Sequence, residues 1–199
     1  MARDASLEEY AEASKEFRPV TPPQNWKATP GIPDRPFYRE DAPFRAKLSP
    51  PGASGEILII HGRVWGLDTK KPLSHCVLEV WQADVHGCYD FKELRQPIHP
   101  DVFLNRARLI TDETGYYEFE AIRPGPPESH ASTQRASRIH CIVRHPSYRS
   151  LTTQIFFKGD PHQAGDSSVN PALILDLKEH KAGPVTFKSS RFDIILERG

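Results

Sequence analysis

One stretch of this 199-residue sequence decides its fold class: Arg138-Ile139-His140-Cys141-Ile142-Val143, followed by Thr152-Thr153-Gln154-Ile155-Phe156-Phe157. Both runs are rich in β-branched and aromatic residues, which favour strands. Turn-forming residues, among them Pro146, separate the two runs. The stretch therefore predicts two neighbouring strands.

Five further runs of the same kind lie outward from this stretch, each bounded by Gly, Pro, Asp or Asn: residues 57–65, 77–81, 108–110, 116–119 and 192–196. Seven short strands separated by turns are typical of an all-β antiparallel sandwich and not of a doubly wound fold. Between two of them, Asp112-Glu113-Thr114-Gly115 predicts a hairpin turn, with Gly115 free to adopt a positive φ.

The N-terminal part of the chain has a different character. Apolar residues at spacings of three and four predict a weakly amphipathic helix over residues 5–17. Proline recurs from residue 20 to 51, and residues before proline avoid the helical conformation, so this part is expected to wrap the core as an extended arm. We therefore divide the chain into residues 1–50, the helix and arm, and residues 51–199, the sandwich core.

Composition excludes several classes of function. Lys and Arg total 26, as do Asp and Glu, so no basic field is available to attract nucleic acid. The longest apolar runs are far shorter than the roughly 20 residues that cross a bilayer, so no membrane contact is expected. Acidic residues within residues 1–10, where a secretory signal would be apolar, predict a cytoplasmic protein. Three cysteines without paired spacing favour neither a disulfide framework nor a thiolate zinc site.

Three blocks of sequence, taken in order, carry a family resemblance. The first contains Val80-Trp81-Gln82-Ala83-Asp84 and Gly87-Cys88-Tyr89; the second contains Thr111-Asp112-Glu113-Thr114-Gly115-Tyr116-Tyr117 and Pro124-Gly125-Pro126; the third contains Arg138-Ile139-His140, Lys158-Gly159-Asp160-Pro161 and Arg191-Phe192-Asp193-Ile194-Ile195-Leu196. Together they resemble the intradiol ring-cleavage dioxygenases of the protocatechuate and catechol type, from about residue 29 to the C-terminus. The resemblance implies their β-sandwich fold and a small aromatic substrate.

The resemblance also implies where a metal would bind, because that family holds a ferric ion with two tyrosines and two histidines. Tyr89 matches the first tyrosine, and His140 matches the second residue of the His-x-His pair. Pro127 stands where the second tyrosine is expected, and Arg138 stands where the first histidine is expected. Two of the four ligand positions are therefore replaced.

Arg138 opposes a ferric ion electrostatically. A unit charge ~4 Å from a trivalent ion is repelled by roughly 12 kcal/mol at an effective dielectric constant of 20, and arginine does not lose its proton in proteins. We therefore expect no metal and no other cofactor. The alternative is Fe(III) bound by a rearranged set made of Tyr89, His140 and His130, a loop histidine three residues beyond Pro127.

Further pocket residues follow from the strand pattern and from the resemblance. Alternate residues of a strand face the same way, so Arg138 is expected beside His140 in the pocket, the alternative being a pair with a surface carboxylate. The resemblance adds Arg135, which in relatives stabilises charge on the substrate, and Gln154 on the next strand. Tyr38, on the arm, is expected either to contact substrate or to pin the arm to the sandwich.

These residues leave three functions open. In the first, Tyr89 and His140 transfer protons while Arg135, Arg138 and Gln154 bind an oxyanion, giving a metal-free isomerase, cyclase or lyase for a phenolic, enolic or polyketide-like compound. A nearby guanidinium is then expected to lower the pKa of Tyr89 below about 10. The second is ferric ring cleavage, and the third is non-catalytic binding of an aromatic acid. A homodimer is expected, since relatives commonly associate.

Overall fold

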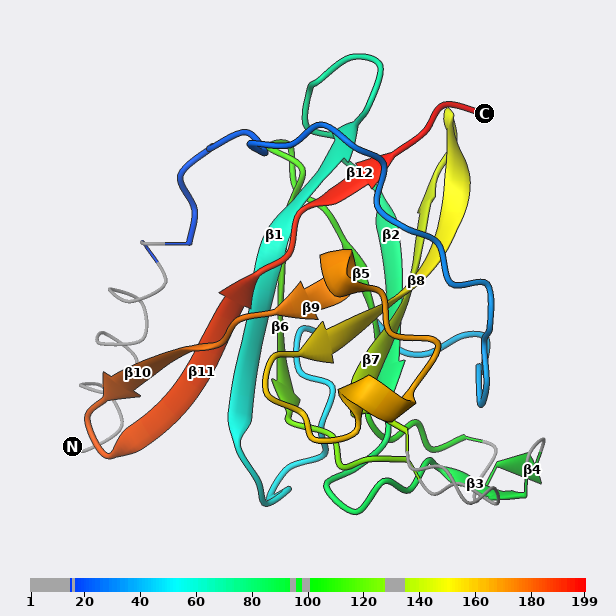
Figure 1. The fold of residues 1–199 in the computed structure, drawn as a ribbon, viewed down its shortest axis with the longest axis vertical. Helices are drawn as coiled ribbons and strands as arrows, with labels where there is room; N and C mark the ends of the chain where they lie inside the picture. The colour runs from blue at the N-terminus through cyan, green and yellow to red at the C-terminus, as the bar shows by residue number, and fades with distance from the viewer. Residues whose placement is uncertain (1–14, 16, 94–95, 98–100, 128–134) are drawn as a thin grey trace.

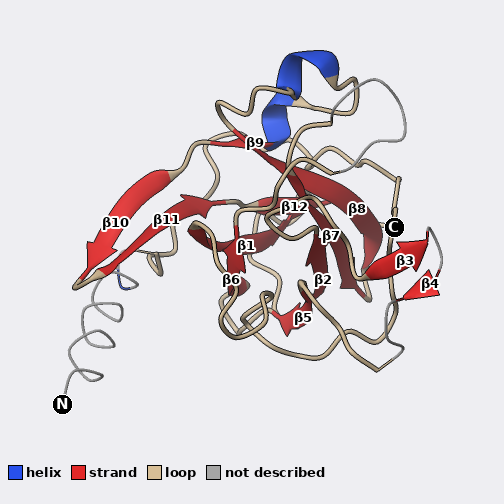
Figure 2. Ribbon diagram, turned by 90° about the horizontal axis from the view of Figure 1, so that it is seen from below, coloured by secondary structure: helices blue, strands red, loops and turns tan. Residues whose placement is uncertain are grey.

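The computed structural model describes residues 15, 17–93, 96–97, 101–127 and 135–199. Its regular elements are β1 (Ile57–Gly66), β2 (Val77–Gln82), β3 (Phe91–Glu93), β4 (Gln96–Pro97), β5 (Arg106–Ile110), β6 (Tyr116–Ile122), β7 (Arg138–His145), β8 (Tyr148–Phe157), the 3₁₀ turns η1 (Gln163–Gly165) and η2 (Pro171–Leu173), β9 (Ile174–Leu175), β10 (Lys178–Ala182), β11 (Val185–Arg191) and β12 (Ile194–Leu196). They form a β-sandwich, as Figures 1 and 2 show, so the expected all-β fold class is confirmed.

Two five-stranded sheets make the sandwich. One has the order β10-β11-β1-β12 with β6 also paired to β1, and the other has the order β5-β2-β7-β8-β9. One hydrophobic cluster between them includes Ile60 and Phe119 from the first sheet and Leu78, Cys141 and Ile155 from the second, each at most 1% exposed. Burial of this apolar surface is the main force that holds the sheets together.

All seven strands expected from the sequence are present, but the sheets are not purely antiparallel as expected. The pairs β2–β7, β7–β8 and β1–β6 are antiparallel, whereas β11 and β12 run parallel to β1, and β9 runs parallel to β8. Gly115 has a φ of 71°, as expected, and its amide donates to Asp112 O at 2.9 Å. The hairpin prediction is nevertheless wrong, because β5 pairs with β2 and β6 pairs with β1, so this turn crosses from one sheet to the other.

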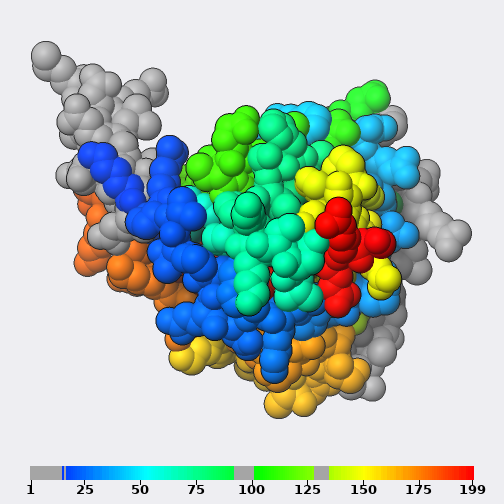
Figure 3. Space-filling model, turned by 90° about the horizontal axis from the view of Figure 1, so that it is seen from above, coloured from blue at the N-terminus to red at the C-terminus, as the bar shows by residue number. Residues whose placement is uncertain are grey.

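The arm lies against the sandwich, and the space-filling view shows its first part in blue on the surface (Figure 3). Main-chain hydrogen bonds fasten it: Thr29 N donates to Ile195 O at 3.0 Å and Ile32 N donates to Thr152 O at 2.8 Å. The helix predicted over residues 5–17 falls outside the described residues, apart from 15 and 17. Within the described ranges, the structure contains no helix of the length and apolar character that a bilayer crossing requires.

Candidate functional site

Four side chains form a row across the neighbouring strands β5, β2, β7 and β8. Arg106 is the direct partner of Trp81, Trp81 of His140, and His140 of Gln154. Directly opposite residues in an antiparallel sheet point to the same face, and Arg138, two positions before His140, shares that face. All five are at most 2% exposed. The intervening residues belong to the hydrophobic core, so the row occupies the outer face of this sheet, beneath the arm and loops.

Tyr89 reaches this row from the loop that follows β2. Its hydroxyl oxygen lies 2.9 Å from Nε2 of His140. The loop is held by Asp84, whose Oδ1 accepts backbone N–H bonds of 2.8 and 2.9 Å from residues two and four positions further on. At Gly87, φ is 84° and an added Cβ would lie 2.0 Å from the main-chain oxygen of Pro126, so the path of the loop requires glycine there.

Aromatic rings hold both members of the Tyr89–His140 pair. The Trp81 ring stacks on His140 with centroids 4.9 Å apart and an interplanar angle of 10°. The ring of Phe37, on the arm, stacks on Tyr89 at 4.3 Å and 17°. Phe37 could not be singled out from the sequence, because a contact made by an extended arm has no local periodicity.

Tyr38, the arm residue that the sequence did single out, lies elsewhere. Its hydroxyl donates a 2.9 Å hydrogen bond to Glu79, and its ring packs against Trp81 at 5.3 Å. These contacts fit the alternative in which Tyr38 pins the arm to the sandwich.

The expected lowering of the Tyr89 pKa is wrong in sign. Burial of the phenol raises the pKa of Tyr89 to about 12, although the charges of Arg138, Arg106 and Arg135 each act to lower it. Burial, followed by the same three charges, holds the pKa of His140 well below its usual 6.5. Both groups are therefore neutral near pH 7, and their hydrogen bond joins a phenol to an imidazole.

Arg138 is held by a partner that sequence reasoning missed. Its Nη2 donates to a carboxylate oxygen of Asp166, with both side chains at most 3% exposed, so the carboxylate is buried and not at the surface. Its other bonds are from Nη1 to Gln154 Oε1 at 3.0 Å, from Nη1 to Ser168 Oγ at 2.8 Å, and from Nε to Ala136 O at 3.0 Å. Most donors of Arg138 are thus used within the protein.

Arg135 and Gln154 retain polar atoms for a ligand. The side chain of Arg135 is 39% exposed, lies 3.9 Å from Asp166 and, among the described residues, donates one hydrogen bond, of 3.5 Å to Ser168 Oγ. Gln154 uses its oxygen for Arg138, while its Nε2 is buried without a hydrogen-bond partner in the described structure. Buried donors are almost always satisfied, so an unpaired one is a candidate ligand contact.

A second buried ion pair, also missed from the sequence, lies next to Tyr89. Asp90 accepts a 2.8 Å bond from Arg106 Nε and another of 2.8 Å from Arg39 Nη1. Nη1 of Arg106 is buried and has no partner among the described residues. Arg106 therefore contributes a positive charge close to the Tyr89–His140 pair. Its position follows from the pairing of β5 with β2 and of β2 with β7, which puts Arg106 and His140 on the same face.

The residues present do not fit the ferric ion of the resemblance. Of the four ligand positions, only Tyr89 and His140 carry side chains that can coordinate a metal. These two side chains are hydrogen-bonded to each other. In the described part of the chain, no three side chains of His, Cys, Asp or Glu come together as a metal site. Arg138 repels a nearby cation less than expected, because Asp166 neutralises its charge. His130, the alternative ligand, lies outside the described residues.

Comparisons with known proteins agree with this fold. Residues 36–198 match a family model described as Dioxygenase. The intradiol ring-cleavage dioxygenase prcA of Aspergillus niger is 27% identical over 75% of this chain and 52% of its own length. The chlorocatechol 1,2-dioxygenase of Rhodococcus opacus is 30% identical over 81% of this chain and 70% of its own. The dioxygenase domain of a dioxygenase–carbohydrate-binding fusion from Streptomyces sp. SirexAA-E superposes with a TM-score of 0.72 and 27% identity, over 87% of this chain and all of that domain.

The fold and the site thus define an intradiol-type β-sandwich in which two ligand positions have changed. The chain belongs to the intradiol dioxygenase family. It spans about half the length of prcA.

Proposed function

We propose that this protein is an enzyme in which the Tyr89–His140 pair carries out acid–base chemistry without a metal. Its substrate is a phenolic, enolic or polyketide-like small molecule, and the reaction is an isomerisation, a cyclisation or a carbon–carbon lysis. The observation that carries the proposal is the 2.9 Å hydrogen bond between Tyr89 and His140, two neutral groups able to pass a proton.

The proton path follows from that bond. The path uses the His140 tautomer that carries its proton on Nδ1, in which Nε2 accepts from the Tyr89 hydroxyl. The oxygen lone pairs of Tyr89 are then free to accept a proton from an acidic O–H or C–H of the substrate. As that proton moves to Tyr89, the phenol proton moves to His140, and free tyrosinate never forms. The high pKa of Tyr89 is then no obstacle to its role. Return of the proton to a different substrate atom completes an isomerisation with no net change in composition.

The charge left on the substrate needs a binding site, and Arg135 and Gln154 Nε2 supply donors for it. That negative charge also offsets the burial and the cationic neighbours that oppose protonation of His140. The imidazole therefore becomes an effective proton acceptor only when the substrate anion is bound. Arg138, bonded to Asp166, positions Gln154 through its bond to the amide oxygen.

The test is turnover of a panel of phenols and enolic ketones by wild type, Tyr89→Phe and His140→Ala, with Tyr148→Phe and His162→Ala as matched controls. We expect each site variant to lower kcat at least 100-fold, the usual scale of acid–base assistance of about 10²–10⁴, with the controls unchanged. Activity should be flat from pH 7 to 9, since neither group titrates there. Unchanged turnover in both site variants would refute these roles, and binding without turnover would favour a non-catalytic protein.

A second candidate is iron-dependent aromatic ring cleavage, which the names of the relatives favour, among them catechol and hydroxyquinol 1,2-dioxygenases. It requires ligands in addition to Tyr89 and His140, such as His130. Protein expressed with iron supplied should then contain stoichiometric iron and show the visible absorption of ferric tyrosinate. We expect iron-free, colourless protein, and the opposite result would make ring cleavage the better answer.

A further inference from the structure

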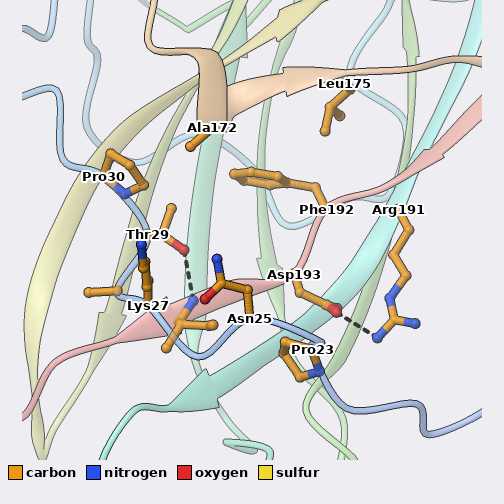
Figure 4. A pocket seen from close by; sticks show the side chains of 12 residues that line it. Pro23, Asn25, Lys27, Thr29, Pro30, Ala172, Leu175, Arg191, Phe192 and Asp193 are labelled. Carbon is orange, nitrogen blue, oxygen red and sulfur yellow. Dashed lines mark hydrogen bonds and ion pairs between the residues drawn. The ribbon is translucent and has the colours of Figure 1, made fainter.

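A cleft, separate from the Tyr89–His140 pair, lies where the arm crosses the sandwich (Figure 4). It has a volume of about 350 Å³. Three segments line it: residues 23–30 of the arm, Ala172 and Leu175 around η2 and β9, and residues 191–195 leading into β12. Small-molecule sites usually measure about 300–1,000 Å³, so this cleft suits a small ligand.

The arm is fixed where it forms one wall. Thr29 and Ile195 exchange two hydrogen bonds, one from Thr29 N to Ile195 O at 3.0 Å and one from Ile195 N to Thr29 Oγ1 at 2.8 Å. The Trp26 ring packs edge-on against Trp65 with centroids 5.7 Å apart. Its neighbours on either side, Asn25 and Lys27, both line the cleft. The wall is thus formed before any ligand arrives, which reduces the entropy lost on binding.

The remaining walls are largely apolar. Phe192 and Ile195 are each 5% exposed and Leu175 is 8% exposed, and prolines 23 and 30 complete the lining. Figure 4 shows the ring of Phe192 extending across the cleft toward Pro30 and Ala172. An apolar ligand body placed against this ring would remove hydrocarbon from water.

The polar groups of the cleft favour an anion. Asp193, the one carboxylate in the lining, is fully used: Oδ1 accepts from Arg63 N at 3.0 Å and Oδ2 accepts from Arg191 Nη2 at 2.5 Å. Arg191 engages the described residues through Nη2 alone. Lys27 forms no salt bridge within the described part of the chain, and the Asn25 amide forms no hydrogen bond there. Figure 4 places Lys27 and Arg191 at opposite ends of the cleft, so an anion beside Lys27 and Asn25 meets one cation without a counter-charge among the described residues.

We propose that this cleft binds a small organic carboxylate with an aromatic or branched apolar body. The carboxylate contacts Lys27 and the side-chain amide of Asn25, and the body packs on Phe192. The site is independent of the chemistry at Tyr89 and His140, since none of its lining residues contributes to that pair.

The test uses amide ¹H–¹⁵N spectra of the full chain titrated with benzoate as the probe. We expect saturable shifts in residues 25–30 and 191–195, and much weaker shifts with benzyl alcohol, which keeps the ring and lacks the charge. Lys27→Met should weaken benzoate about three- to fivefold, the usual scale for one partly exposed ion pair. Ala172→Phe, which fills the cleft, should abolish the shifts. Lys47→Met, at a lysine paired with Glu120 outside the cleft, is the control and should change nothing.

The outcomes separate this site from the catalytic proposal. Benzoate shifts confined to residues around Arg135 and His140 would place the anion at the other site and overturn the inference. Equal binding of benzyl alcohol would refute the role of the Lys27 charge, as would a Lys27→Met variant that binds benzoate as tightly as Lys47→Met does. The Arg135→Ala variant should keep the shifts at residues 191–195 whether or not the enzyme proposal holds.

Discussion

Replacing Asp166 by Asn tests the buried ion pair that Asp166 forms with Arg138, two positions before His140. The change leaves the Arg138 guanidinium, 2% exposed, without its counter-charge. Breaking a buried pair by removing one partner typically costs about 3–5 kcal/mol. Asn keeps one oxygen for the backbone amide of Ala136, now 3.0 Å from the carboxylate, so part of the hydrogen bonding survives.

A second estimate comes from the pKa of Asp166. Burial alone would raise this pKa, but hydrogen bonds from Ser168 and the charge of Arg138 outweigh it and lower the pKa from 3.8 to about 2. A shift of that size corresponds to about 2 kcal/mol of folding stability for the charged carboxylate. The native pKa is the lower one, so this stability is present above about pH 4 and is lost as the pH falls toward 2.

The two estimates bracket the free energy of unfolding that Asp166→Asn loses at about 2–5 kcal/mol. For a chain of this size such a loss lowers Tm by roughly 4–20 °C. Thermal and urea unfolding at pH 7 and pH 3 measure it, with Asp176→Asn as control, since that carboxylate is 73% exposed and pairs with a surface lysine. The difference in unfolding free energy between wild type and Asp166→Asn should be smaller at pH 3 than at pH 7. If the two Asn variants unfold alike at pH 7, or if that difference is independent of pH, the reasoning is refuted.

Three further predictions concern the site. Gly87→Ala should cost more than about 2 kcal/mol in urea unfolding, because a positive φ and a backbone clash act together. Phe37→Ala should lower the pKa of Tyr89 from about 12 toward 10, since burial is what raises it, and ultraviolet titration of the phenol will measure this. The double variant Pro127→Tyr with Arg138→His should bind ferric iron, detected by metal analysis and a visible absorption band, because it restores four donor positions.

Each of these has its own control. Gly159→Ala shares a positive φ of 80° but has no atom within 4 Å of the added Cβ, so it should cost only about 1 kcal/mol or less. An equal loss at both glycines would remove the clash argument. A Tyr89 pKa that stays near 12 without Phe37 would show that the arm does not exclude water from the phenol. Iron uptake by either single variant, or no uptake by a folded double variant, would contradict the inference that all four ligand positions are needed to bind ferric iron.

The sequence by itself determined seven of the strands and which residues of β7 share a face. Alternating positions placed Arg138 and His140 on one face of β7, because side-chain direction in a strand has a period of two. The β10–β11 pair escaped prediction, since its burial is partial and its charged residues hide the alternation. Which strands pair in parallel, and which sheet each joins, depends on contacts distant in the chain.

Only the tertiary structure decided the chemistry of the pair at Tyr89 and His140. Local sequence suggested that arginine would lower the pKa of Tyr89, yet burial under Phe37 and the surrounding loops raises it, and burial is a property of the packed molecule. Asp166 lies 28 residues from Arg138 in the chain and meets it only through the folded loop after β8. Charge balance in a buried site is fixed by such long-range contacts, because desolvation and Coulomb energy depend on position in space and not on order in the sequence.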